Sequence, residues 1–301
     1  MIKGRFAPSP SGRMHLGNVY TALMSWLLAK SKGGEWILRI EDLDRQRCKK
    51  EFADLIMEDL SWLGLEWDEK PVVFQSARTE IYLRHLEILK SRGGVYPCFC
   101  RRADLMASSA PHASDGTPVY SGTCRNLLPQ EIQNKLKAQN PALRVHVPDT
   151  ESCFTDAHYG EQRCNLQKDC GDFILCRADG NVSYQLAVVV DDALMGVTQV
   201  VRGNDLLPST HQQIFLYGAL GFTPPEFFHI PMLLSHDGKR LSKRDSSLSM
   251  QELKKNFSAA QLIGKIMRLT GFLEKEIPLT PFQALEFFSE EKLPHKDIYV
   301  S

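Results

Sequence analysis

The amino-terminal third of the chain alternates between short apolar runs and longer stretches whose apolar residues recur every three or four positions. Residues 2–6 predict a strand, and residues 16–27 predict a helix that ends at a pair of glycines. Residues 35–44 predict a second strand with carboxylates at its end, and residues 52–63 predict a second helix. This alternation is typical of parallel βαβ units, in which ligands bind at the carboxyl ends of the strands.

The pattern changes between residues 95 and 175. Dispersed cysteines, a segment rich in serine, proline and glycine, and short ambiguous strands predict an insertion there. Strand and helix alternation resumes over residues 176–249, so we expect the sheet to be completed after the interruption. Residues 250–301 predict a short helical tail.

Composition narrows the range of partners. The chain has 301 residues, 43% of them hydrophobic, and its 36 basic residues balance its 36 acidic ones. Because the net charge is zero, long-range attraction cannot supply nonspecific nucleic-acid binding, and any such partner must be recognised locally. The amino terminus has no apolar signal segment, and the longest aliphatic run, at residues 186–190, is too short to span a bilayer. We expect a cytoplasmic, monomeric protein without membrane association.

The stretch RFAPSPSGRMHLGN, residues 5–18, joins the first predicted strand to the first predicted helix. Backbone N–H groups and the helix dipole at such a turn can hold a phosphate. The stretch matches neither GxGxxG nor GxxxxGK[ST], which argues against a Rossmann dehydrogenase and a P-loop NTPase. His15 could donate to phosphate oxygens, and Gly17 could leave room for an adenine face. The alternative is an N-cap histidine beside a structural glycine.

A second stretch, GKRLSKRD at residues 238–245, places four cationic side chains around Leu241 and Ser242. A basic loop of this kind could close over a polyphosphate. Taken alone, it could equally be a solvated surface loop.

Together and in this order, HLGN and RLSKR resemble the HIGH and KMSKS signatures of class I aminoacyl-tRNA synthetases. RFAPSPSGRMHLGN, RIEDLD, SYQLAVVVDD and VVRGNDLL are similar to the glutamyl and glutaminyl branch, so the likeness covers residues 1–250. Arg240 departs from the pattern because the signature usually has a lysine there, whereas Lys243, the second lysine, is intact.

The resemblance implies an α/β fold, with a Rossmann-like parallel sheet interrupted by a zinc-containing insertion and followed by a short helical tail. Residues 1–94 and 176–249 would be the two halves of the nucleotide-binding catalytic domain, and 95–175 a zinc-binding, acceptor-like subdomain.

The resemblance also implies that glutamate attacks the α-phosphate of ATP, which carries Mg²⁺, to form an adenylate. His15 and Lys243 would be catalytic because they would stabilise the charge that develops on the phosphates. The residues implied in ATP binding are His15, Gly17, Asn18, Arg240, Ser242 and Lys243.

Selection of an acidic amino acid needs both signs of charge. Arg5 and Arg202 can each meet a carboxylate, Glu41 can hold an α-ammonium group, and Tyr184 supplies a hydroxyl. A fully charged guanidinium such as that of Arg202 also prefers an anion to a neutral amide. Surface salt bridging is the alternative. By resemblance, the glutamate site comprises Arg5, Phe6, Ala7, Pro8, Ser9, Glu41, Tyr184 and Arg202.

Eight cysteines without an export signal point to free thiols or metal ligands. Cys98, Cys100 and Cys124 supply three of the four ligands that structural zinc requires. On spacing alone the fourth could be His112, His146, His158 or Tyr120; the family's Cys-x-Cys and Tyr-x-x-x-Cys set implies Tyr120. The remaining cysteines have no ligand spacing and are predicted to be ordinary core or surface thiols: Cys48, Cys153, Cys164, Cys170 and Cys176.

Two further groups of residues are predicted to be structural. Asp191 and Asp192 follow an apolar run and could form a metal pair, but we expect a strand-end turn or a helix cap. The tryptophans are predicted to be core aromatics: Trp26, Trp36, Trp62 and Trp67.

Full glutamyl-tRNA synthetases continue from the basic loop into a large anticodon-binding region, whereas here only residues 251–301 follow. The chain therefore resembles a short group of this branch, whose members activate glutamate without tRNA. They transfer it to queuosine at the wobble position of tRNA(Asp), so the partner implied is the tRNA(Asp) anticodon arm bearing queuosine. The alternatives are a truncated synthetase charging a tRNA 3′ end, a non-catalytic paralogue that binds glutamate or tRNA, and a generic nucleotidyltransferase.

Overall fold

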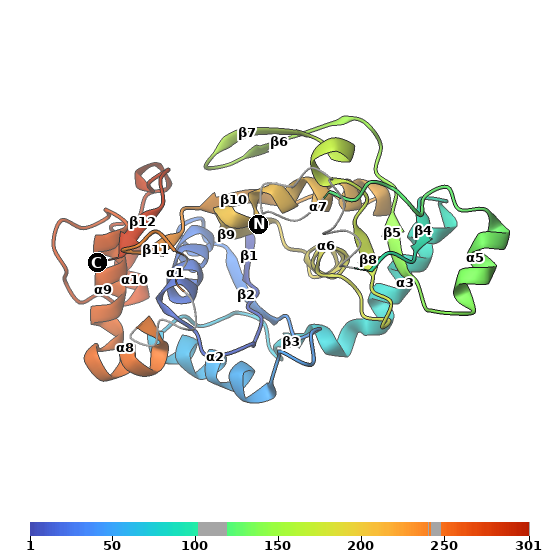
Figure 1. Cartoon of the computed structure of the whole chain (residues 1–301). Coiled ribbons are helices and arrows are strands. Elements are labelled where there is room, and N and C mark those ends of the chain that lie inside the picture. Colours follow the sequence, from blue (N-terminus) through green and yellow to red (C-terminus); the bar gives the residue numbers. More distant parts are fainter. Residues whose placement is uncertain (102–118, 240, 242–247, 301) are drawn as a thin grey trace.

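The computed structural model describes residues 1–101, 119–239, 241 and 248–300 (Figure 1). The strands are β1 (Lys3–Phe6), β2 (Glu35–Ile40), β3 (Val73–Phe74), β4 (Val95–Cys98), β5 (Ala142–Val145), β6 (Glu151–Asp156), β7 (Gly160–Asn165), β8 (Ile174–Cys176), β9 (Gln199–Gly203), β10 (Glu226–Ile230), β11 (Leu233–Ser235) and β12 (Ile298–Val300). The α-helices are α1 (Leu16–Ser31), α2 (Lys50–Leu63), α3 (Thr79–Ser91), α5 (Pro129–Leu136), α6 (Tyr184–Leu194), α7 (Leu207–Leu220), α8 (Met250–Asn256), α9 (Ala259–Leu269) and α10 (Pro281–Ala284). Within these described ranges, no helix is both long enough and apolar enough to cross a bilayer.

The central sheet is parallel and has the strand order β10-β9-β1-β2-β3. Strands that precede residue 95 therefore pair with strands that follow residue 198. The predicted parallel sheet, interrupted by an insertion and completed after it, is confirmed. Because its strands are parallel, the segments that leave β1, β2, β9 and β10 emerge at one edge.

Both faces of this sheet are buried. Val200 and Phe227 pack with α3, α6 and α7, whereas their neighbours Val201 and Phe228 pack with α1. Successive side chains of a strand point to opposite faces, so a strand covered on both sides becomes a continuous apolar run. The predicted core role of the tryptophans is confirmed in part: Trp26 and Trp36 are fully buried, while the other two are half-buried against the same core.

The insertion forms two separate β structures. An antiparallel sheet, β4-β5-β8, carries α5 at its outer end, and β6 and β7 form a hairpin. The hairpin returns to the central sheet, where the Ala157 amide donates to the Phe227 carbonyl over 2.8 Å. It also packs on α7. The two parts of the insertion therefore have different neighbours.

The prediction of a strand-end turn or cap at Asp191 and Asp192 is wrong. The apolar run before them belongs to α6, and both aspartates are buried within this helix. A short aliphatic run does not distinguish a buried strand from a buried helix. The helix begins at Ser183, whose hydroxyl accepts a hydrogen bond from the Leu186 amide.

The carboxyl-terminal segment is more than the expected helical tail. Its helices α9 and α10 contact α2 and α1, and β12 pairs in parallel with β11 (Figure 1). Leu262, Ile266 and Met267 are fully buried in the same core cluster as α1. The segment therefore completes the first core.

Gly264 of α9 provides a test of this docking. A Cβ atom at residue 264 would lie 1.9 Å from the Ile277 carbonyl oxygen. Because both groups are held by backbone, we expect Gly264→Ala to destabilise the fold by about 2–3 kcal/mol in chemical denaturation. The matched control is Gly218→Ala in α7, where a Cβ would meet no atom within 4 Å and where alanine favours the helix by up to about 1 kcal/mol. Equal stabilities of the two variants would contradict close packing of this segment.

Candidate active site

A cavity of about 600 Å³ opens at the carboxyl ends of β1 and β9, beside the amino terminus of α1. The parallel sheet brings these three segments to one edge although they are far apart in the sequence. The predicted site residues that line this cavity are Arg5, Phe6, Ala7, Pro8, Ser9, His15, Gly17, Asn18, Tyr184 and Arg202.

A second cavity of about 440 Å³ adjoins the first, and Ser9, Ser11 and Tyr184 line both. Glu41 lines the second cavity. It is buried, and burial raises the pKa of its carboxyl group although the charges of Arg39 and Arg5 oppose that rise. The structure therefore places an acidic side chain in the cavity next to the one that holds Arg5 and Arg202.

Arg5 and Glu41 belong to a buried ionic network centred on Asp192. Arg5 Nε lies 3.2 Å from Asp192 Oδ1, and Arg39 Nη1 lies 2.7 Å from the same oxygen. Arg39 Nη2 also donates to Glu41 Oε1 over 3.1 Å. Burial acts to raise the pKa of Asp192, but the charges of Arg39 and Arg5 lower it below its usual value. Arg5 thus lines the cavity while its Nε atom is paired with Asp192.

Asp191, the neighbour of Asp192 on α6, contacts residues on or just before α3. Its carboxylate accepts hydrogen bonds from Arg78 Nε over 2.7 Å, Tyr82 Oη over 2.7 Å and Gln75 Nε2 over 3.0 Å. These donors precede or lie on α3, so the two aspartates of α6 join α3 and the central sheet. Their role as found is structural, because side-chain hydrogen-bond donors of the surrounding elements pair with both carboxylates.

Arg202 differs from Arg5 in its partners. Its Nε donates to His229 Nε2 over 3.0 Å, and its Nη2 donates to Thr210 Oγ1 over 2.8 Å. Within the described residues, no carboxylate forms an ion pair with Arg202 and its buried Nη1 atom has no hydrogen-bond partner. Burial lowers the pKa of Arg202. A buried cation at a cavity wall with an unused donor is a receptor for an anionic group.

His15 occupies the N-cap of α1, as the structural alternative predicts, and also lines the cavity. Asn18 Oδ1 accepts a hydrogen bond from the His15 amide over 3.0 Å. A Cβ atom at Gly17 would lie 3.1 Å from the His15 ring, so this glycine makes room for the imidazole. Gly17 also lines the cavity, and its role beside an adenine face stays a prediction.

Arg240, Ser242 and Lys243 of the basic loop lie outside the described residues. The segments on either side of the loop adjoin the cavity. Leu241 lines it, Ser249 forms a β-bridge with His15, and the Met250 amide donates to the Met14 carbonyl over 2.9 Å.

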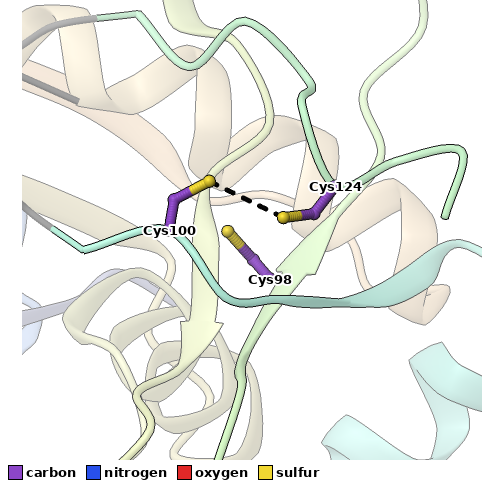
Figure 2. Close-up of side chains that lie close together, drawn as sticks. All are labelled: Cys98, Cys100 and Cys124. Atoms are coloured by element: carbon purple, nitrogen blue, oxygen red, sulfur yellow. Dashed lines mark hydrogen bonds between the residues drawn. The ribbon is translucent and has the colours of Figure 1, made fainter. Parts of the chain in front are cut away.

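Cys98, Cys100 and Cys124 come together in the insertion (Figure 2). Their sulfur atoms all lie within 4.8 Å of one another, and the Cys100 and Cys124 sulfurs are 3.6 Å apart. Tyr120 Oη lies 3.4 Å from Cys98 Sγ and 3.7 Å from Cys100 Sγ. Thiolates at about 2.3 Å from a tetrahedral ion would lie about 3.8 Å apart. The set therefore fits a four-coordinate metal.

The other residues considered as the fourth ligand are placed differently. The His158 ring donates from Nε2 to the Pro294 carbonyl over 3.0 Å and stacks on His295, so its partners are not the cysteines. His146 is exposed, and His112 lies outside the described residues. Burial raises the pKa of Cys100 to about 11 and that of Tyr120 further. A bound cation would reverse this preference for the protonated forms.

Sequence reasoning missed Arg39, which shares Asp192 with Arg5, and the two residues behind Arg202, His229 and Asp156. Arg39 sits within the apolar strand EWILRI and His229 within EFFHI, and a polar residue inside a fully buried strand signals a buried partner. Asp156 carries no such local signal, because it ends a hairpin strand of alternating exposure.

The comparisons with known proteins identify the family. Residues 1–295 match the family described as tRNA synthetases class I (E and Q), catalytic domain. A glutamyl-Q tRNA(Asp) synthetase from Symbiobacterium thermophilum is 46% identical, and the match covers 100% of this chain and 96% of that protein. A glutamate–tRNA ligase from Aquifex aeolicus is 41% identical over 97% of this chain but 60% of its own length.

A solved structure shows the same fold. The glutamate tRNA ligase from Elizabethkingia meningosepticum, in complex with its amino acid, superposes with a TM-score of 0.83 at 29% identity, covering 100% of this chain and 67% of that one. With the family match over nearly the whole chain, this likeness identifies the class of enzyme. The chain belongs to the class I tRNA synthetases of the E and Q type and is a ligase of the glutamyl-Q tRNA(Asp) synthetase kind.

Proposed function

We propose that this chain activates glutamate with ATP to glutamyl-adenylate without tRNA. It then transfers the glutamyl group to queuosine at the wobble position of tRNA(Asp). The observation that carries the proposal is that Arg5 and Arg202 line the same cavity as His15 and Asn18, where an acidic amino acid and a triphosphate would meet.

The geometry supports a separate role for each residue in binding glutamate or ATP. Arg202 offers a buried, unused Nη1 donor to a carboxylate of glutamate, and Arg5 adds a second positive charge at the same wall. Glu41, in the adjoining cavity, would receive the α-ammonium group, whose charge would lower the pKa that burial raises. His15 and Asn18, with the basic loop that contains Arg240 and Lys243, would stabilise the phosphates, and Mg²⁺ would accompany ATP. Catalysis would then rest on positioning and on preorganised charge.

The relatives favour queuosine transfer over 3′-end charging. Those that this chain covers over 95% or more of their own length are named glutamyl-Q tRNA(Asp) synthetases, whereas the glutamate–tRNA ligases are covered over about 60%. Because 41% identity to those ligases is substantial, charging of the 3′ end of tRNA(Glu) remains the second candidate.

Two assays decide between these functions. Glutamate-dependent exchange between ATP and pyrophosphate without tRNA is expected, and its absence would favour a binding paralogue. Labelled glutamate should then enter tRNA(Asp) that bears queuosine and not tRNA(Asp) with unmodified guanosine. Label at the 3′ end of tRNA(Glu) would contradict the proposal and support the second candidate.

We also propose that Cys98, Cys100, Tyr120 and Cys124 hold one structural Zn²⁺. Metal analysis of the purified protein should find one zinc per chain, and Cys124→Ser should lose it and lower the melting temperature, because a structural zinc site contributes directly to folding. Cys153→Ser is the matched control, since Cys153 is exposed and lies on the hairpin. Full zinc retention in Cys124→Ser would contradict the ligand assignment.

A further inference from the structure

The orientation of Arg202 depends on a chain of buried hydrogen bonds that leads away from the cavity. Its Nε and Nη2 atoms are held by His229 and Thr210, as described above, and the side chains of His229 and Thr210 are fully buried. The guanidinium is therefore fixed along one edge. The Nη1 atom, on the remaining side, is the donor left for a ligand.

His229 must accept the hydrogen bond from Arg202, since a guanidinium has no lone pair to offer. Its other ring nitrogen, Nδ1, lies 2.6 Å from Asp156 Oδ2. An ionised carboxylate there keeps the ring proton on Nδ1 and leaves Nε2 as the acceptor. Burial and the nearby Arg202 charge lower the pKa of His229, which agrees with a neutral ring. The neutral ring can therefore accept from Arg202 without placing a second positive charge beside it.

Asp156 is itself held in place by backbone. Its Oδ1 atom accepts from the amides of His158 over 3.0 Å and Tyr159 over 2.8 Å, and its Oδ2 accepts from the His229 amide over 3.1 Å. Burial acts to raise the pKa of the Asp156 carboxyl group, but the hydrogen bond with the His229 ring and those from the Tyr159 and His158 amides lower it below its usual value. Asp156 ends β6, so a hairpin of the insertion supplies a partner to a residue of the catalytic sheet.

We propose that Asp156 and His229 are positioning residues for the recognition of glutamate. Asp156 fixes the tautomer of His229, and His229 fixes the guanidinium of Arg202 so that Nη1 points its donors at a substrate carboxylate. Neither residue lines the cavity, and both act through Arg202. This inference rests on the proposed function, because it takes glutamate as the ligand of Arg202.

Two substitutions of His229 distinguish its contact with Asp156 from its contact with Arg202. In His229→Asn, the shorter amide can still donate to Asp156 but does not reach Arg202. In His229→Gln, the longer amide can place its oxygen where Nε2 accepts from Arg202. We expect His229→Asn to raise the KM for glutamate in the exchange reaction by about 10–100-fold, because a hydrogen bond to a charged group is lost. The KM for ATP should change less than about two-fold, and His229→Gln should restore most of the glutamate affinity.

Asp156→Asn provides a second variant that keeps the size of the side chain. The amide group of the new asparagine would donate to His229 Nδ1, so the ring proton would move to Nε2. The N–H groups of His229 Nε2 and Arg202 Nε would then face each other with no acceptor between them. We expect the same selective rise in the KM for glutamate.

The matched control is His211→Asn. His211 is a buried histidine of α7 that contacts the same hairpin through Ser152, and it does not line the cavity. It should change the melting temperature without changing the KM for glutamate.

The outcomes separate this inference from the proposed function. A folded His229→Asn variant with wild-type KM for glutamate would overturn the inference while leaving the function intact. Equal rises in the KM for glutamate and ATP, shared with His211→Asn, would show a general structural effect and would also overturn it. A wild-type protein without glutamate-dependent exchange would overturn the proposed function itself.

Discussion

Replacing Asp192 by alanine is expected to destabilise the fold by about 3–5 kcal/mol, the usual cost of removing one partner of a buried ion pair. Asp192 lies on α6 with a side chain only 4% exposed, and it neutralises both Arg5 and Arg39. Its loss removes the carboxylate that pairs with Arg5, while Arg39 keeps Glu41 and Asp191 as buried partners. Chemical denaturation followed by circular dichroism measures the effect.

A second consequence of Asp192→Ala concerns the cavity. Arg5 loses the contact on its Nε side and is expected to move, so the KM for glutamate should rise in the fraction that remains folded. The matched control is Asp54→Ala, which breaks an exposed pair with Lys50 on α2 and should cost no more than about 0.5 kcal/mol. A similar small loss for both variants would show that the Asp192 network does not support the fold.

Replacing Lys243 by alanine is expected to lower kcat/KM for glutamate-dependent exchange by at least about 100-fold with little change in stability. Removal of one preorganised donor from a charged transition state typically costs about 3 kcal/mol. Although Lys243 lies outside the described residues, the chain leaves the cavity at Leu241 and returns to it at Ser249 and Met250, beside His15. The described residues before and after Lys243 therefore lie next to the proposed phosphate site. Steady-state exchange kinetics and a melting curve measure the two effects.

Two variants test whether this effect belongs to Lys243. Arg240→Lys restores the residue usual in the family signature, and it should retain activity within a few-fold because the charge is kept. Lys255→Ala removes an exposed cation of α8 that pairs with Glu252, and exchange should be unaffected. Wild-type exchange by Lys243→Ala would remove this lysine from the mechanism.

Loss of the proposed metal should affect one part of the insertion, the sheet that contains β4, and not the β6–β7 hairpin. The cysteine cluster belongs to β4 and the loops near it, whereas Asp156 belongs to the β6–β7 hairpin. Zinc loss should therefore loosen the outer sheet and leave the hairpin contact at Phe227 in place. The expected result is a lower melting temperature in Cys124→Ser with a nearly unchanged KM for glutamate, the reverse of His229→Asn.

The sequence by itself determined the local features of this protein. Hydrophobic periodicity and glycine pairs located β1, α1, β2 and α2, and the change of pattern located the insertion within a parallel sheet. These features depend on residues close in the chain, for which spacing and conformational preference are sufficient. Cys98, Cys100, Tyr120 and Cys124 could be grouped because the Cys-x-Cys and Tyr-x-x-x-Cys spacings can be read along the chain and the family pattern joins the two pairs.

Only the tertiary structure decided how the site residues are held. The run before Asp191 could be a strand or a helix until its neighbours were known, and the contact between Arg39 and Asp192 joins residues 153 positions apart. His229 and Asp156 are separated by 73 positions. The burial of a charge is stable only where a distant partner meets it, and that meeting depends on how the elements pack. The sequence therefore named the cations that line the cavity, and the fold selected the buried residues that contact them.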